Sequence, residues 1–425
     1  MLASLHYMLT GIKEVLIYVT IFIGLYFQVF LLISYFFYDG TTEFGEIDEV
    51  SGELYEPTVA IMVPCYNEEN TVAGTIHSLL AMDYPREKLR IVAIDDGSKD
   101  GTWAALQEFK DNISVVLLQK QNEGSKFAAL NYGLAAIMRD IPDVGVIGCL
   151  DADSHVDVNA LRASMREFTK PGVMAVVPSM VIDRPKSFFQ ILQKVEYELS
   201  NYSKQVYSRL NTLYIAPGPF SMFRREVFDR LGNYHEAHHV EDMEMALRMQ
   251  LAGMRLSHAV DSIVYTKGPR TWSALLKQRV RWTYGFIMNV WDYRGVYFKS
   301  SIGDLAVMLP FLFLTTFISV LFIPFMIMGF VVPIVTFFER YSVTHQIVSP
   351  VHFDVFYLNT QVYTIMSYIT VGILLITIFI GRKSLLRQRA VSWDLLVMIA
   401  YPFFSAWWTG LSAYNAVRGK KKSWR

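Results

Sequence analysis

The sequence predicts an α/β domain built on a parallel sheet and joined at both ends to helices that enter a membrane. Two observations lead to this fold class. Short apolar, strand-like runs alternate with helical stretches between residues 58 and 150, a pattern typical of twisted parallel sheets with helices on both faces. Long apolar tracts lie near both ends of the chain, and only 18% of the residues are charged, whereas a soluble domain carries about 25%.

The strand-like runs and helices follow one another in a regular order. We expect strands over 58–63, 89–94, 114–118 and 144–150, and helices over 69–81, 103–109 and 127–138. Ligands of such sheets bind at the carboxyl ends of the strands. The chemically unusual residues of this chain cluster at those ends.

Four apolar tracts are long enough to interact with a bilayer, which a helix of ~20 residues can span. The first, 15–38, contains no charge and is too long for a removable signal peptide. The others cover 304–337, 361–381 and 393–416. Because Pro402 interrupts the last tract and a basic tail follows it, we expect a re-entrant or interfacial hairpin there.

These tracts divide the chain into regions. We expect an N-terminal transmembrane helix (1–38), an acidic linker (39–57), a globular domain (58–270), an interface-helix region (271–303), a membrane region (304–416) and a basic tail (417–425). The loop after the third tract, GRKSLLRQR, carries four basic residues and should face the cytoplasm. If 304–337 crosses once, the globular domain is also cytoplasmic, in a multi-pass protein of the plasma or inner membrane.

Composition excludes several other classes. The formal net charge is zero, which gives no sign of a nucleic-acid partner. The two cysteines, Cys65 and Cys149, follow apolar runs and are expected to be buried free thiols. Two cysteines offer neither a disulfide framework nor a cysteine zinc site.

Acidic residues follow three of the predicted strands, in the stretches PCYNEE (64–69), DDGS (95–98) and DAD (151–153). Aspartates two positions apart in extended chain project to the same side, so Asp151 and Asp153 can share a hard divalent cation. Such a cation would neutralise a departing diphosphate. The alternative is that Asp96 and Asp153 only cap the helices that follow.

Six segments together resemble glycosyltransferase family 2. They are VPCYNEE, DDGSKDGT, GSKFAALN, LDADS, VED and QRVRW, in this order between residues 63 and 282. The resemblance implies a GT-A fold, a nucleotide-diphosphate sugar donor, and Mg²⁺ or Mn²⁺ as the cofactor. It implies that the donor is bound by Pro64, Tyr66, Glu68, Asp96, Lys126 and Asp151, and the metal by Asp153 with Asp151. The family pattern has glycine directly before the lysine, whereas here Ser125 separates Gly124 from Lys126.

The stretch HEAHH (235–239) also matches the H-E-x-x-H pattern of zinc proteases, which requires both histidines on one helix. Gly232 and Asn233 lie immediately upstream, and no apolar helical stripe covers the motif. We therefore expect a loop. In the family pattern Asp242, beside Glu241, is the general base that takes the proton of the acceptor hydroxyl. A helix over 243–251 would place this acidic pair at its amino end, where negative charge is favoured.

The segment QRVRW indicates the subclass. Gln278, Arg281 and Trp282 share one helical face, where Arg281 can bind phosphate and Trp282 can stack on a sugar ring. The alternative is an amphipathic surface helix anchored by tryptophan. Q-x-x-R-W is similar to the mark of processive members, the hyaluronan, chitin, cellulose and poly-N-acetylglucosamine synthases. The resemblance assigns Gln278 and Arg281 to the donor, and Trp282 with Gly218 to the acceptor.

These resemblances imply a membrane-embedded inverting glycosyltransferase that extends a polysaccharide and couples synthesis to export. UDP-N-acetylglucosamine is the first expected UDP-sugar donor. One alternative enzyme adds a single sugar to a polyprenyl-phosphate or another membrane lipid acceptor. A non-enzymatic alternative is a membrane scaffold with an inactive transferase domain, against which the complete set Asp96, Asp151, Asp153 and Asp242 argues.

Overall fold

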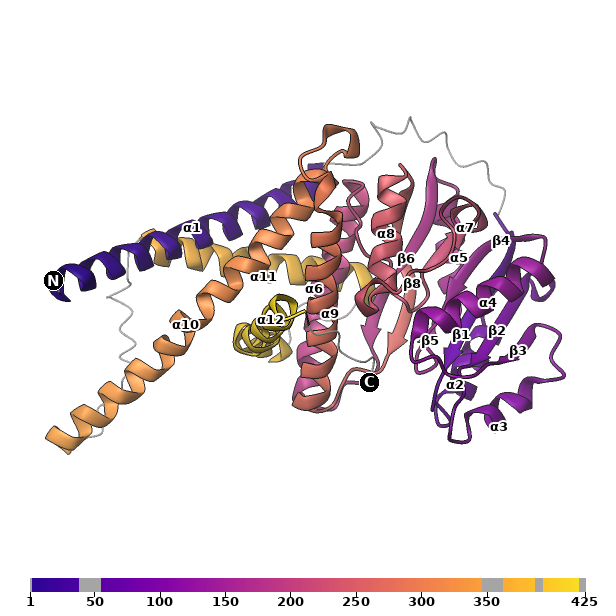
Figure 1. Cartoon of the computed structure of the whole chain (residues 1–425), viewed down its shortest axis with the longest axis horizontal. Helices are drawn as coiled ribbons and strands as arrows, with labels where there is room; N and C mark the ends of the chain where they lie inside the picture. The colour runs from indigo at the N-terminus through magenta and orange to yellow at the C-terminus, as the bar shows by residue number, and fades with distance from the viewer. Residues whose placement is uncertain (1, 38–54, 346–361, 387–392, 420–425) are drawn as a thin grey trace.

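The computed structural model describes residues 2–37, 55–345, 362–386 and 393–419. Most of the expected linker over 39–57 and much of the basic tail over 417–425 therefore lie outside the described residues. An α/β domain forms one side of the molecule, and long apolar helices extend away from it on the other side (Figure 1).

The described chain forms one mixed sheet with the strand order β3-β2-β1-β4-β7-β6-β8-β5. The strands are β1 Thr58–Cys65, β2 Leu89–Asp95, β3 Val115–Gln119, β4 Val144–Cys149, β5 His155–Val156, β6 Val173–Ile182, β7 Met222–Arg224 and β8 Arg255–Thr266. Strands β3, β2, β1 and β4 are parallel, as the sequence predicts. The short strand β7 runs antiparallel to both β4 and β6, so the remainder of the sheet is mixed.

The parallel strands align the polar residues that follow them. β1 and β2 are almost fully buried, which is why both are nearly continuous apolar runs rather than alternating ones. Their register pairs Pro64 with Ile94 and Cys65 with Asp95, and Met62 of β1 pairs with Cys149 of β4. The segments after β1, β2 and β4 therefore emerge at one edge of the sheet.

Helices cover both faces of this sheet. They are α2 Val72–Leu80, α3 Thr102–Leu106, α4 Lys126–Asp140, α5 Ala160–Phe168, α6 Phe188–Arg209, α7 Arg225–Leu231 and α8 Glu241–Leu251. The next helix, α9 Trp272–Asp292, packs on α12 instead. Short 3₁₀ turns are η1 Arg86–Lys88, η2 Gln107–Phe109, η3 Ala237–His239, η4 Tyr293–Val296 and η5 Ser300–Ile302. Alternate residues of β1 enter two separate cores: Met62 packs on the side of α4 and α6, and Ile61 on the side of α2 and α5. Cys65 and Cys149 are buried free thiols, which confirms that prediction.

The elements that the sequence assigns to the membrane, called the membrane helices below, are α1 Leu2–Phe37, α10 Leu305–Thr344, α11 Val362–Leu386, η6 Trp393–Ala400 and α12 Tyr401–Val417 (Figure 1). Within the described residues, three segments are long and apolar enough to cross a membrane: Ile17–Phe37, Thr364–Lys383 and Asp394–Val417. The segment Leu305–Ile318 of α10 is a shorter apolar stretch.

The hairpin expected within 393–416 is wrong. The chain continues from η6 directly into α12 without reversing, and Ala400 between them has helical backbone angles. Pro402 lies in the first turn of α12, where the missing proline N–H has no helical partner to lose. The proline therefore marks a change from 3₁₀ to α geometry rather than a turn.

A buried ion-pair network attaches the membrane helices to α6. Arg382 of α11 donates to Glu198 at 2.6 Å and to Asp394 at 2.9 Å, and Lys194 pairs with Asp394 at 2.6 Å. Arg382 is only 3% exposed. Gly381 allows the two helices to approach, because a Cβ atom there would overlap the backbone of Glu198. Arg382 belongs to the expected basic loop GRKSLLRQR (381–389), but residues 381–386 of that stretch are part of α11, so the loop prediction is wrong for these residues.

Candidate active site

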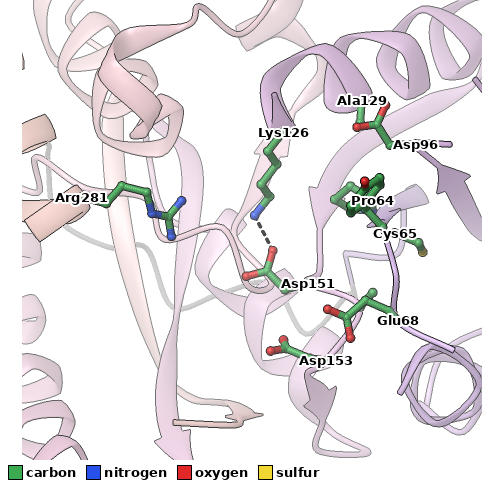
Figure 2. Close-up of a pocket in the computed structure, with 11 residues that line it drawn as sticks. Pro64, Cys65, Glu68, Asp96, Lys126, Ala129, Asp151, Asp153 and Arg281 are labelled. Atoms are coloured by element: carbon green, nitrogen blue, oxygen red, sulfur yellow. Dashed lines mark hydrogen bonds and ion pairs between the residues drawn. The ribbon is translucent and has the colours of Figure 1, made fainter. Parts of the chain in front are cut away.

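A pocket of about 200 Å³ opens at the carboxyl ends of β1, β2 and β4 (Figure 2). It is lined by Pro64, Cys65, Tyr66, Glu68, Asp96, Lys126, Ala129, Asp151, Ala152, Asp153 and Arg281. A second cavity, of about 520 Å³, shares Lys126, Asp151, Asp153 and Arg281 and reaches Gly218, Glu241, Asp242, Gln278 and Trp282. Every site residue predicted from the sequence thus lines one of two adjoining cavities.

A lysine–aspartate pair lies at the junction of these cavities. α4 begins at Lys126, whose Nζ donates to Asp151 Oδ1 (Figure 2). Burial acts to lower the pKa of Lys126, but the carboxylate of Asp151 outweighs burial and raises the pKa above its ordinary value. A Cβ atom at Gly218 would lie 2.8 Å from Lys126 Nζ, so glycine leaves room for this pair. Gly218 therefore sits beside the donor-side residues.

Three carboxylates face the lower part of the pocket, where Figure 2 shows Asp151, Asp153 and Glu68 together. Burial and the repulsion from Asp151 and Glu68 raise the pKa of Asp153 to about 6. Among the described residues, no three His, Cys, Asp or Glu side chains form a complete metal site. Magnesium is commonly held by one or two carboxylates together with substrate phosphates. Asp151 and Asp153 fit that kind of site.

The helix that follows β2, α3, has Gly101 as its N-cap and no side-chain cap, so Asp96 does not cap that helix. In the turn after β2, Asp95 accepts the Ser98 N–H at 3.0 Å. Asp96 is 5% exposed in the pocket wall and pairs with Lys120 at 3.0 Å. The sequence analysis did not select Lys120. This residue directly follows β3, and β3 ends at the same edge of the sheet as β1, β2 and β4, so its position could have indicated that it lies near the pocket.

The acidic pair lies at the start of α8, as predicted. Glu241 is the first residue of this helix, and Asp242 Oδ1 accepts the Met243 N–H at 2.8 Å. Removal from water and the neighbouring Glu241 raise the pKa of Asp242 to about 6, while Lys126 and Arg281 oppose the shift. Gly285 of α9 permits close packing on the residue before α8, because a Cβ atom there would overlap Val240. This contact brings α8 and α9 to one cavity.

The HEAHH stretch is a loop, which confirms the prediction. Ala237, His238 and His239 all have positive φ angles, of 42°, 55° and 68°. His235 Nδ1 lies 3.0 Å from Glu244 Oε1, whereas His238 Nε2 lies 2.8 Å from Asp292 Oδ2. The positive φ angles at residues 237–239 exclude the single helix that would place His235 and His239 on one face, and the described residues contain no group of His, Cys, Asp or Glu that could hold zinc.

The QRVRW segment lies on α9 between the active site and the membrane helices. Gln278 accepts a hydrogen bond from Gln193 Nε2 at 3.0 Å. Trp282 lines the second cavity and also a third one, of about 600 Å³, which extends among the membrane helices. Trp282 therefore lies at the border between these two cavities. Sequence analysis missed Arg279 within this segment and Glu196 of α6, which line both cavities as well.

Comparison with known proteins agrees with this geometry. Residues 57–285 match the family model described as glycosyltransferase like family 2. The chain belongs to this glycosyltransferase family. It is 28% identical over 241 residues to poly-beta-1,6-N-acetyl-D-glucosamine synthase of Staphylococcus aureus (strain MSSA476), covering 56% of this chain and 55% of that protein. The synthase of the same name from Staphylococcus epidermidis is 27% identical over 273 residues, 64% of each chain.

The matched regions of this family 2 transferase span a little more than half of the Staphylococcus aureus relative. A mannosyltransferase from Pyrobaculum calidifontis, solved in complex with GDP-Man and Mn²⁺, resembles the whole fold with a TM-score of 0.56 at 16% identity. That likeness covers 93% of this chain and 99% of the other. The predicted GT-A fold class, combined with apolar helices, is confirmed.

Proposed function

We propose that the protein is a membrane-embedded inverting glycosyltransferase that extends a polysaccharide. Its donor is a UDP-sugar, with UDP-N-acetylglucosamine as the first choice because the curated relatives are named poly-beta-1,6-N-acetyl-D-glucosamine synthases. One observation supports the step from sugar transfer to polymer synthesis: the cavity that contains Asp242 and the cavity among the membrane helices share Trp282 and several other lining residues.

The lining of that third cavity suits a sugar chain. Hydroxyl and aromatic side chains from α1, α10 and α12 surround it, among them Thr20, Thr315, Thr316, Tyr401, Ser405, Trp408 and Thr409. Hydroxyl groups exchange hydrogen bonds with sugar hydroxyls, and aromatic faces pack on the apolar faces of sugar rings. A polymer could therefore slide along this lining without being held at a single position.

The donor's diphosphate would lie between the carboxylates and the basic side chains. Arg281 approaches the pocket from the opposite side to Asp96 (Figure 2), and its guanidinium can bind phosphate oxygens in bidentate fashion. Lys126 supplies a second positive charge. Asp151 and Asp153 would hold a Mg²⁺ or Mn²⁺ ion, whose charge favours departure of the diphosphate. We place Tyr66 and Glu68 toward the nucleoside, at the end of β1.

Asp242 would act as the general base. It accepts the proton of the acceptor hydroxyl while that oxygen bonds to the anomeric carbon of the donor sugar. The bond from the anomeric carbon to the diphosphate breaks at the same time, and the nucleoside diphosphate departs with the electron pair. Lys126 and Arg281 stabilise the charge that develops on the leaving group. A single displacement of this kind inverts the anomeric configuration.

The transfer rate should depend on pH through Asp242. The base must be deprotonated, and its pKa is raised to about 6, so the rate at saturating donor and Mg²⁺ should be constant above neutrality. Below pH 6 the rate should fall about tenfold per unit, because the carboxylate is progressively protonated. A pH–rate profile checks this expectation. A rate that stayed constant down to pH 4 would remove Asp242 as the base.

Replacing Trp282 should separate polymer synthesis from donor binding. We expect Trp282→Ala nearly to abolish polymer while donor affinity stays within a few fold of wild type, because the indole face grips the acceptor and not the nucleotide. Changes at Gln278 or Arg281 should instead weaken donor binding. Product sizing and calorimetric titration with UDP-sugar measure the two effects.

The control for this experiment is Trp282→Phe, which keeps an aromatic face. If the indole serves the acceptor, the phenyl ring should preserve part of the polymer yield, whereas alanine preserves little. A stably folded Trp282→Ala protein that still makes full-length polymer would refute the acceptor role, and the processive assignment would lose its main support.

The proposed function itself is tested by incubating the purified full-length protein with a panel of labelled nucleotide sugars and sizing the products. A ladder of saccharides is the expected result. A single lipid-soluble product would support transfer of one sugar to a membrane lipid. No turnover of any donor would support a scaffold with an inactive domain.

A further inference from the structure

Arg279 contacts both Trp282 and Glu196, and it lines two cavities. Its guanidinium carbon lies 4.5 Å from the centre of the Trp282 ring, in stacking position. Its Nη2 donates to Glu196 Oε2 of α6 at 2.7 Å. Its side chain is 6% exposed, yet it lines both the catalytic cavity and the cavity among the membrane helices. One face of the indole is therefore occupied by protein, which leaves the other for a ligand.

The contacts of Arg279 extend through Glu196 to α12, one of the membrane helices. Glu196 accepts a second hydrogen bond, from the hydroxyl of Tyr401 at the start of α12, at 3.2 Å. Tyr401 lines the membrane-side cavity together with Trp282 and Arg279. The chain Tyr401–Glu196–Arg279–Trp282 thus joins α12, α6 and α9.

We propose that Arg279 is a positioning residue that holds the Trp282 ring as an acceptor platform, and that Glu196 and Tyr401 hold Arg279 in place. The inference deepens the proposed function and rests on it. It gives a role to Arg279 and Glu196, which have none in the sequence pattern or the proposed mechanism, and a second role to Tyr401 of the cavity lining. It also connects the platform to the lining of the membrane-side cavity.

The physical reason is the geometry of the indole. A tryptophan at the border of two open cavities has room to change rotamer, and each change would turn its face away from the acceptor. A guanidinium stacked on one face restricts the ring, because its planar shape and positive charge are both attracted to the indole surface. Glu196 fixes the guanidinium in turn, since a partly buried carboxylate paired with a buried arginine at 2.7 Å is strongly oriented.

The test is steady-state kinetics of single additions to a short N-acetylglucosamine oligosaccharide, with the nucleotide sugar that the donor panel identifies. We expect Arg279→Gln to raise the acceptor KM about tenfold, the size expected for loss of a well-formed cation–π contact. The donor KM should stay within about twofold, because Arg279 lines the acceptor-side cavities and not the donor pocket.

Two further variants keep the test decisive if Arg279→Gln folds poorly. Arg279→Lys keeps a cation that can reach both partners, so its acceptor KM should return to within about threefold of wild type. Tyr401→Phe removes a single hydroxyl at the outer end of the chain of contacts and should raise the acceptor KM about twofold. Lys277→Gln is the matched control, because it removes an exposed positive charge from the same helix and should change neither KM.

The possible outcomes distinguish a failure of this inference from a failure of the proposed function. If wild-type protein transfers sugar to no saccharide acceptor, the proposed function fails and the inference fails with it. If wild type transfers sugar and Arg279→Gln has an unchanged acceptor KM, only the positioning role is overturned. A rise in donor KM equal to the rise in acceptor KM would also overturn it, because it indicates general damage to the fold.

Discussion

An Asp242→Asn variant should transfer sugar about 100- to 10,000-fold more slowly than wild type, the usual cost of losing a general base. Asparagine has nearly the same shape, and its side-chain oxygen can still accept the Met243 N–H at the start of α8. Folding and donor binding should therefore survive. Single-turnover measurements with saturating donor isolate the chemical step. The weak residual rate should also lose its dependence on pH near 6, because the titrating group is absent.

The neighbouring histidines provide the control. His235 and His239 have no chemical role in the proposed mechanism, and His235 contacts Glu244 rather than the reacting groups. The double alanine variant should keep metal-dependent transfer within about tenfold of wild type, well above the loss expected for Asp242→Asn. Stoichiometric zinc in the purified protein, lost in the double variant, would contradict the loop assignment.

Asp153→Asn should also remove most of the turnover, and a chelator should do the same to wild type. Asp151 and Asp153 are the carboxylates that fit a divalent cation, and losing a cation beside a departing diphosphate removes several kcal/mol of transition-state stabilisation, on the order of 100-fold or more in rate. The assay measures turnover after EDTA treatment and again after Mg²⁺ or Mn²⁺ is restored. Wild type should recover, whereas Asp153→Asn should not.

Asp111→Asn is a suitable control, because it removes an exposed carboxylate elsewhere in the α/β domain. It should keep the activity and the metal dependence of wild type. Undiminished activity of Asp153→Asn in the presence of chelator would contradict the metal site. An Asp153→Asn protein that regained wild-type turnover at high Mg²⁺ would show that the carboxylate contributes to metal affinity alone.

The first half of the sheet was predictable, and the second half was less so. β1, β2, β3 and β4 are continuous apolar runs separated by helical stretches, so local pattern alone indicates parallel strands. β7 has only three residues, Met222–Arg224, and it lies between β4 and β6 with antiparallel pairing. Pairings of this kind depend on chain segments that are distant in sequence, and local patterns carry no record of them.

The residues of the candidate site were also predictable only in part. Residues such as Asp153, Asp242 and Arg281 lie in short motifs. Asp153 follows β4, so its place at the carboxyl ends of the strands was predictable, whereas Asp242 and Arg281 reach the site through the packing of α8 and α9. The support beneath Trp282 was not predictable, because Glu196 lies 83 residues before Arg279 and 205 residues before Tyr401. Pro402 led to a wrong hairpin because a proline in the first turn of a helix and a proline in a loop look alike in sequence.

The ion pairs between α6 and α11 also bear on how the chain is made. Arg382 follows its partner Glu198 by 184 residues, and Asp394 follows Lys194 by 200. A chain growing from its N-terminus would therefore complete the α/β domain while Glu198 and Lys194 still face water. Their burial must wait until α11 is inserted and docks on α6. A nascent chain that stopped before residue 382 would leave these charges exposed, so α6 gains its ion-pair partners only after α11 and η6 have been made.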